Sequence, residues 1–250
     1  MPDVAHLLLI SVVIAGAAMV KGAVGFGFPL VSIPILSAII GPRAAVPVIA
    51  VPTLLSNFIM VSRGSASRTS RASTHLLLAL AGLAVGTLAG AAVIKALDPR
   101  WLSVLVGVVT LSYVVATALR LTALVPEVAG RRAAPVVGLA AGLLGGATGI
   151  FAPLLASYLH LLHMAKREFI FWITMMFFVS NIVQVVSYAH LGLYAGQVLL
   201  LALIGCVPMA IGTWSGMALQ DRLDPEIFGR IVLGIVFIAS LNLLVRGLIR

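Results

Sequence analysis

The feature that most constrains the fold is a series of apolar runs, several of them long enough to cross a bilayer, which takes roughly 20 residues of helix. Of the 250 residues, 62% are hydrophobic and 9% are charged, and a soluble domain of this size cannot bury so much apolar surface. The sequence therefore predicts an all-α polytopic membrane protein. The runs occupy about residues 4–20, 27–41, 44–62, 75–96, 101–119, 133–148, 151–164, 169–188, 197–219 and 227–246.

Two halves of the chain resemble each other. At an offset of 124 positions, Gly22, Gly25, Pro29 and Asn57 fall on Gly146, Gly149, Pro153 and Asn181. Further on, Leu97-Asp98-Pro99 falls on Leu223-Asp224-Pro225, which one two-residue insertion explains. We predict a first membrane repeat over 1–120, a basic linker over 121–132 and a second membrane repeat over 133–250. Because the first two runs of each repeat are short, eight to ten membrane segments are expected. The first run is expected to be a membrane segment rather than a cleaved signal.

Basic residues in the connectors predict how the halves are oriented. The 63–74 connector and the 120–132 linker each carry three arginines, and two runs separate them, so both can be cytoplasmic. The counterpart of the first connector, residues 190–196, carries no Lys or Arg and fits the outer face. Corresponding loops on opposite sides predict inverted repeats with both termini outside, an arrangement that Arg246 and Arg250 fit poorly.

The charge balance excludes some functions. The net charge of +9 comes from bases in short loops, which indicates contact with anionic lipid headgroups and not with nucleic acid. All seven acidic residues fall at or near segment ends. A carboxylate proton relay or a cation path would need an acid in mid-membrane. The partners predicted are a small anion, membrane lipids and, as an open alternative, further copies of the chain.

Two glycine-rich stretches interrupt the apolar pattern and are predicted to break a helix. Glycines free the backbone, and a proline suits the first turn of the segment that follows. The N–H groups freed at such a break attract anions, although glycines also serve close helix packing. The stretches run from Lys21 to Leu36 and from Gly145 to Leu154. The predicted substrate-binding positions within them are Gly22, Gly25, Gly27, Gly146, Thr148 and Gly149.

Polar side chains complete the predicted anion site. Lys21 either snorkels to the membrane interface or supplies a positive charge beside the first break. Asn57 and Asn181 form a symmetric pair that could hydrogen-bond between helices or orient an oxyanion. Gln184 lies about one helical turn after Asn181, on the same face, and is predicted to bind substrate with it.

Neither metal nor cofactor is predicted. His160 and His163 share a helical face, but no acidic residue stands at ligand spacing and H-E-x-x-H is absent. Nothing resembles a nucleotide-binding loop, so ATP-driven transport would need another subunit. An intramembrane enzyme acting on a lipid or quinone through His160, His163 and His190 remains an alternative to a transporter, as does a membrane scaffold without substrate.

The two glycine-rich stretches resemble those of the sulfite exporter TauE/SafE (TSUP) family. The first reads Gly25-Phe-Gly27-Phe-Pro29 and the second reads Gly142-Leu-Leu-Gly145-Gly146-Ala-Thr-Gly149-Ile-Phe-Ala-Pro153, with Phe151 and Ala152 standing where glycines are usual. The resemblance spans nearly the whole chain. It implies movement of anions across the bacterial inner membrane, typically sulfur oxyanions or organosulfonates such as sulfite, thiosulfate or sulfoacetate.

The sequence thus predicts a secondary transporter rather than an enzyme. A small anion is expected to bind between the two breaks, near the middle of the membrane, and to be released on alternate sides as the two parts rock against each other.

Overall fold

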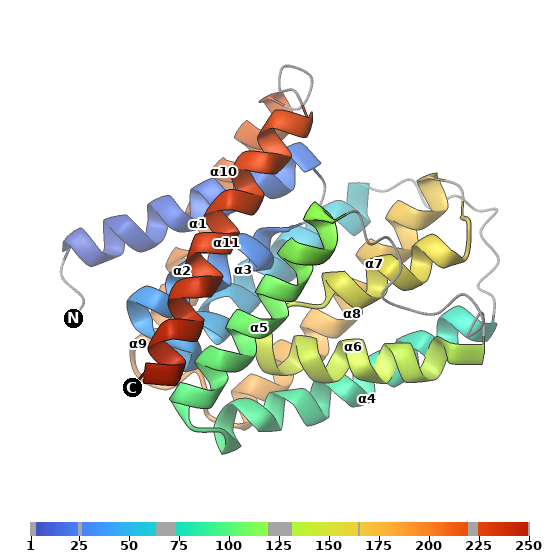
Figure 1. Ribbon diagram of the computed structural model, residues 1–250, viewed down its shortest axis with the longest axis horizontal. Coiled ribbons are helices and arrows are strands. Elements are labelled where there is room, and N and C mark those ends of the chain that lie inside the picture. The colour runs from blue at the N-terminus through green and yellow to red at the C-terminus, as the bar shows by residue number, and fades with distance from the viewer. Residues whose placement is uncertain are drawn as a thin grey trace.

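The protein is seen here in a computed structural model, described for residues 4–24, 27–63, 74–119, 132–164, 166–219 and 225–249. These residues form helices and contain no strand (Figure 1). Ten apolar runs expected from the sequence all lie on helices, but the run over 197–219 is divided at Gly205 into α9 and α10. The helices are α1 (Val4–Val24), α2 (Phe28–Ile40), α3 (Pro42–Arg63), α4 (Thr74–Ala96), α5 (Pro99–Ala118), α6 (Ala134–Thr148), α7 (Ala152–Leu161), α8 (Lys166–His190), α9 (Gln197–Ile204), α10 (Cys206–Leu219) and α11 (Pro225–Ile249).

Within the described ranges, seven stretches are long and apolar enough to cross a membrane. One of them is the combined α9–α10 segment, Gln197–Leu219. Two shorter apolar helices, α2 and α6, flank the breaks. Both the all-α class and the multi-pass membrane character predicted from composition are confirmed. Residues 121–131 of the basic linker lie outside the described residues.

Helix ends carry the polar groups that a membrane protein must satisfy. At the start of α5, the Asp98 side chain caps the helix by accepting a hydrogen bond from the Arg100 backbone N–H at 2.8 Å. At the C-terminal ends of helices, arginine side chains donate to backbone carbonyls. Arg246 donates to the carbonyl of Ala38 in α2 at 2.8 Å, and Arg43 donates to that of Leu97 just after α4. Each arginine places a positive charge where a helix dipole is negative.

Two helix pairs pack with their backbones in direct contact, α4 with α6 and α1 with α10 (Figure 1). Glycines make this approach possible. A Cβ on Gly86 would collide with the carbonyl of Leu139, and a Cβ on Gly142 with that of Leu83. Small residues at such contacts let membrane helices meet closely without any hydrophobic driving force.

The glycine contacts between α4 and α6 recur between α10 and α1, at the repeat offsets of 124 and 126 positions. Gly90 lies against the Leu143 carbonyl, and Gly216 lies against that of Met19, 124 positions before Leu143. The pairs α3–α8 and α5–α11 join corresponding helices of the two halves. This reciprocity supports a duplicated unit, and the opposite membrane orientation of its two copies stays a prediction.

Two apolar clusters fill the interior. One is formed mainly by α1, α2, α3 and α5, and the other by α4, α6, α7 and α8. The α6–α7 break lies where they meet, since Ile150 belongs to the first cluster and Phe151 to the second. The second break therefore lies at the boundary between the two clusters.

Candidate functional site

The helix breaks fall at equivalent places in the two halves. The helix before the break ends at Val24 in one half and at Thr148 in the other, and the next helix begins at Phe28 or at Ala152. Both differences are 124 positions. A glycine in the left-handed region lies in each gap, Gly27 with φ of 100° and Gly149 with φ of 77°. A proline occupies the first turn of both α2 and α7, as predicted.

The second break is held by hydrogen bonds from its own residues. The Gly149 N–H donates to the Gly145 carbonyl at 2.6 Å, which closes the last turn of α6. The Thr148 hydroxyl donates to the Leu144 carbonyl and accepts from the Ile150 N–H at 3.2 Å. Thr148 thus shapes the turn that leads into α7.

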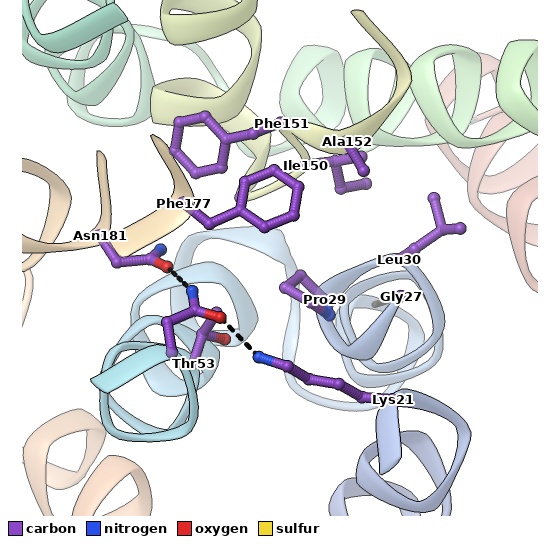
Figure 2. Close-up of a pocket in the computed structure, with 12 residues that line it drawn as sticks. Lys21, Gly27, Pro29, Leu30, Thr53, Ile150, Phe151, Ala152, Phe177 and Asn181 are labelled. Atoms are coloured by element: carbon purple, nitrogen blue, oxygen red, sulfur yellow. Dashed lines mark hydrogen bonds between the residues drawn. The ribbon is translucent and has the colours of Figure 1, made fainter. Parts of the chain in front are cut away.

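A small cavity lies between the N-terminal ends of α2 and α7 (Figure 2). Its volume is about 30 Å³, room for one or two water molecules. Its lining comes from both breaks and from the helices α3 and α8, and it contains no carboxylate. The residues are Lys21, Gly27, Pro29, Leu30, Thr53, Asn57, Gly149, Ile150, Phe151, Ala152, Phe177 and Asn181.

A chain of hydrogen bonds crosses this cavity from one half of the protein to the other. The Lys21 Nζ donates to Asn57 Oδ1 at 2.6 Å, and Asn57 Nδ2 donates to Asn181 Oδ1 at 2.7 Å (Figure 2). Asn57 and Asn181 are repeat partners on α3 and α8, so the symmetric amides predicted from the sequence meet directly. All three side chains are at most 5% exposed.

The chain continues behind Asn181 into the second half. Asn181 Nδ2 donates to Gln184 Oε1 at 2.9 Å, and Gln184 Nε2 donates to the Tyr188 hydroxyl and to the Gly145 carbonyl. The Tyr188 hydroxyl donates in turn to the Gly146 carbonyl at 2.6 Å. Both terminal acceptors belong to the last turn of α6, so the chain ties the amide pair to the second break.

Counting donors shows what this arrangement leaves for a ligand. An ammonium group has three N–H donors and a primary amide has two. One donor each of Lys21, Asn57 and Asn181 is used within the chain, whereas both amide hydrogens of Gln184 have protein acceptors. The unused donors therefore belong to the three side chains that line the cavity.

Lys21 supplies the charge of the site. Among the residues whose burial the structure describes, it is the one Lys, Arg, Asp or Glu with a buried side chain. A buried ammonium group without a carboxylate beside it is costly, because a single amide oxygen replaces only part of its hydration. Negative charge in the cavity would offset part of this cost. Of the two alternatives open for Lys21, the structure favours the charge beside the break over snorkelling.

The structure brings five of the ten predicted site residues to the cavity wall. Of the others, Gly22 packs against α10 and Gly146 against α4, where a Cβ would meet the backbone of the neighbouring helix. Thr148 shapes the α6–α7 turn, and Gln184 supports Asn181 from behind. Gly25 lies outside the described residues. The five at the cavity are Lys21, Gly27, Asn57, Gly149 and Asn181.

Seven further residues line the cavity and Tyr188 anchors the hydrogen-bond chain, and none of these eight was predicted as a site component. Tyr188 lies one helical turn after Gln184 and Phe177 one turn before Asn181, so the i±4 spacing on α8 could have indicated both. Ile150 and Phe151 occupy the break itself, next to Gly149. Nothing in a glycine motif says that such neighbours wall a cavity.

The histidines form no centre of their own. His160 packs on the ring of Phe169 with 4.7 Å between ring centroids. In the part of the chain that the structure describes, no three His, Cys, Asp or Glu side chains are grouped as ligands for a metal ion.

Spanning helices that are broken around a buried cavity lined by a lysine and two amides are typical of a multi-pass membrane protein of the solute-transporter class. The match to a known family agrees. The model of the sulfite exporter TauE/SafE family covers residues 8–243, so the chain belongs to this family of membrane transporters. No curated protein and no solved structure matches the chain significantly.

Proposed function

We propose that this chain is a secondary transporter that moves a small anion, a sulfur oxyanion or an organosulfonate, across the bacterial inner membrane by alternating access. The family is one of sulfite exporters, which supports an oxyanion as substrate. The observation that carries the proposal is Lys21, a buried cation that shares a cavity with two amides and two helix N-termini.

The helix N-termini favour an anion in the cavity. The first N–H groups of a helix lack acceptors within it, and the aligned peptide dipoles place partial positive charge there. In α2 and α7 the residues at these positions, Leu30 and Ala152 among them, line the cavity. Pairs of broken-helix ends facing one site at membrane depth are the arrangement that many secondary transporters use for anionic groups.

The hydrogen-bond chain supports a site that both halves must complete. Lys21 belongs to α1 and Asn57 to α3, whereas Asn181 belongs to α8. An anion that takes the spare donors of all three would join the two halves, and its release would let them separate. The cavity volume of about 30 Å³ is smaller than a sulfonate, so the proposal requires the cavity to widen when the anion binds.

Exchange of labelled sulfite in proteoliposomes, with Lys21→Met compared with wild type, tests the proposal. Methionine keeps the length of the side chain and removes the charge, so we expect exchange to fall at least about 100-fold. That loss corresponds to about 2.7 kcal/mol, within the range for a hydrogen bond to a charged group. The matched control is Lys95→Met, because Lys95 is exposed in the last turn of α4.

Methanesulfonate and thiosulfate would be run beside sulfite as alternative substrates. Undiminished exchange of all three by correctly folded Lys21→Met protein would contradict the assignment of the site. Absence of exchange by wild-type protein for every oxyanion and sulfonate would contradict the transport proposal itself.

A further inference from the structure

A second cavity lies directly behind the wall of the polar one. Its volume is about 230 Å³, and it opens between α5, α6 and the start of α7. Val109 and Ser112 of α5, Ala141 and Leu144 of α6, and Pro153 and Leu154 of α7 contribute to its lining. The site described above makes no use of this space.

The lining of the second cavity offers almost no polar group that needs a hydrogen-bond partner. Its lining is aliphatic and aromatic except for Ser112, whose hydroxyl already donates to the Val109 carbonyl at 2.9 Å. An apolar cavity of about 150 Å³ is large enough to hold a benzene molecule. The space behind the polar cavity therefore suits a hydrocarbon group of at least that size.

Ile150 and Phe151 separate the two cavities, since these two residues line both. Figure 2 shows Phe151 on the side of the polar cavity that is farther from Lys21. The Phe151 ring rests on Gly145, where a Cβ would collide with it. A wall formed by a side chain resting on a glycine can yield by a change of rotamer, without movement of a helix.

We propose that the second cavity is a subsite for the hydrocarbon part of an organic anion whose charged group binds at Lys21. The inference rests on the proposed function and deepens it, because it selects sulfonates or carboxylates with an apolar body of four to six carbons over inorganic oxyanions. The charge lies at one end of the combined site and the apolar lining at the other. An inorganic anion would leave the larger volume unused.

Affinity measured along a series of sulfonates tests the subsite. Sulfite, methanesulfonate, butanesulfonate, benzenesulfonate and the polar-bodied taurine would each compete against labelled sulfite in proteoliposomes. Each methylene that enters an apolar cavity is expected to raise affinity about fourfold. We therefore expect butanesulfonate to bind at least about 30-fold more tightly than methanesulfonate, with taurine close to methanesulfonate.

Variants that fill the cavity show whether this preference arises there. Ala141→Leu fills the second cavity from α6, and Ser112→Leu fills it from α5. The test can be carried out as long as one of the two variants folds. Both are expected to bind butanesulfonate no better than methanesulfonate while keeping their affinity for methanesulfonate within about twofold. Ala140→Leu is the matched control, because Ala140 is the exposed neighbour of Ala141 on the same helix.

The outcomes separate the subsite from the transport proposal. Exchange of sulfite without a preference for longer chains would overturn the subsite alone, and failure to bind any anion would overturn both. If both cavity-filling variants still preferred the longer sulfonates, the subsite proposal would also be overturned. Loss of a co-purified phospholipid from the filled variants, with the sulfonate series unchanged, would assign the cavity to a lipid chain and overturn the subsite as well.

Discussion

The two helix breaks share one backbone design but carry different chemistry. Both have a left-handed glycine between the two helices, and the following helices, which carry proline in their first turns, begin 124 positions apart. The first break has Lys21 beside it and Gly27 just before its helix. At the equivalent positions the second break has Gly145 and Phe151. One copy of the motif thus provides the charge, and the other provides an aromatic wall and the carbonyls that anchor the amides.

This difference teaches that a duplicated backbone need not give a symmetric site. Only the amides Asn57 and Asn181 keep their identity in both copies and bond directly to each other. In the proposed function, an anion at Lys21 would therefore lie closer to the first break. We infer that the second break serves to support the site and, in the subsite proposal, to separate its two parts.

The largest effect is expected from adding a side chain to the break glycines. Gly149→Ala and Gly27→Ala both force alanine into the left-handed region, which costs about 1–2 kcal/mol. Gly149→Ala must also displace the buried Ile33, whereas the nearest atom to a Cβ on Gly27 is in Val20, at 3.9 Å. We expect Gly149→Ala to lower the free energy of unfolding by about 3 kcal/mol in total.

Unfolding in detergent, followed by thermal shift, would measure this difference. Gly41→Ala is the control for strain alone, because Gly41 has φ of 79° and no atom within 4 Å of an added Cβ. Equal losses at Gly149 and Gly27 would show that Ile33 adapts freely and that the two breaks are equivalent in packing.

An intermediate effect is expected from breaking the amide pair on one side or the other. Asn57→Ala removes the partner of the Lys21 ammonium group, a hydrogen bond to a charged group worth about 1.5–3 kcal/mol. Asn181→Ala removes only bonds between neutral groups, worth about 0.6 kcal/mol each in membrane proteins. Asn181 takes part in two such bonds, one of which Asn57→Ala also removes, so sulfite exchange should fall at least about 30-fold in Asn57→Ala and roughly eightfold in Asn181→Ala.

The comparison of these two variants is the sharpest test of asymmetry. A larger loss in Asn181→Ala than in Asn57→Ala would place the charged contact in the second half. Thr53→Val is the control, because Thr53 lies on the cavity wall one turn before Asn57. Its hydroxyl donates to the Ile49 carbonyl of its own helix, so the change removes a polar group from the wall without breaking the hydrogen-bond chain.

The smallest effect is expected from Tyr188→Phe. The change removes the hydroxyl that connects Gln184 to the Gly146 carbonyl, and Gln184 keeps its bond to Gly145. The hydroxyl makes two bonds worth about 0.6 kcal/mol each, so we expect the free energy of unfolding to fall by about 1.2 kcal/mol and the KM for sulfite to rise by no more than about twofold. A tenfold rise in KM would show that the second break positions the amides far more tightly than these bonds suggest.

Much of the fold could be predicted from the sequence, because membrane helices are recognisable as long apolar segments. The repeat was also visible in the sequence. It matched Asn57 with Asn181, and in the structure these two side chains form a hydrogen bond with each other. The division at Gly205 was not foreseen, since α9 and α10 form one apolar run. Hydropathy reports how far a segment is apolar, not whether its helix is continuous.

The site was predicted in outline because buried polar residues are rare in such a chain. Glycines were harder to interpret, because the same residue type exposes backbone at Gly27 and lets helices touch at Gly22 and Gly146. Arg43 was equally ambiguous from sequence. A lipid phosphate is the default partner of an arginine near the interface, yet here its guanidinium binds carbonyls at the end of α4.

The reciprocal glycine packing has a consequence for how such a protein could have arisen. The glycine face of α4, in the first half, is covered by α6 of the second, and α10 of the second half is covered by α1 of the first. A half-length ancestor would have left both faces bare and could have closed them only against another copy of itself. Fusion of two such copies into one chain would have freed each to change alone, as the lysine beside one break and the phenylalanine in the other illustrate.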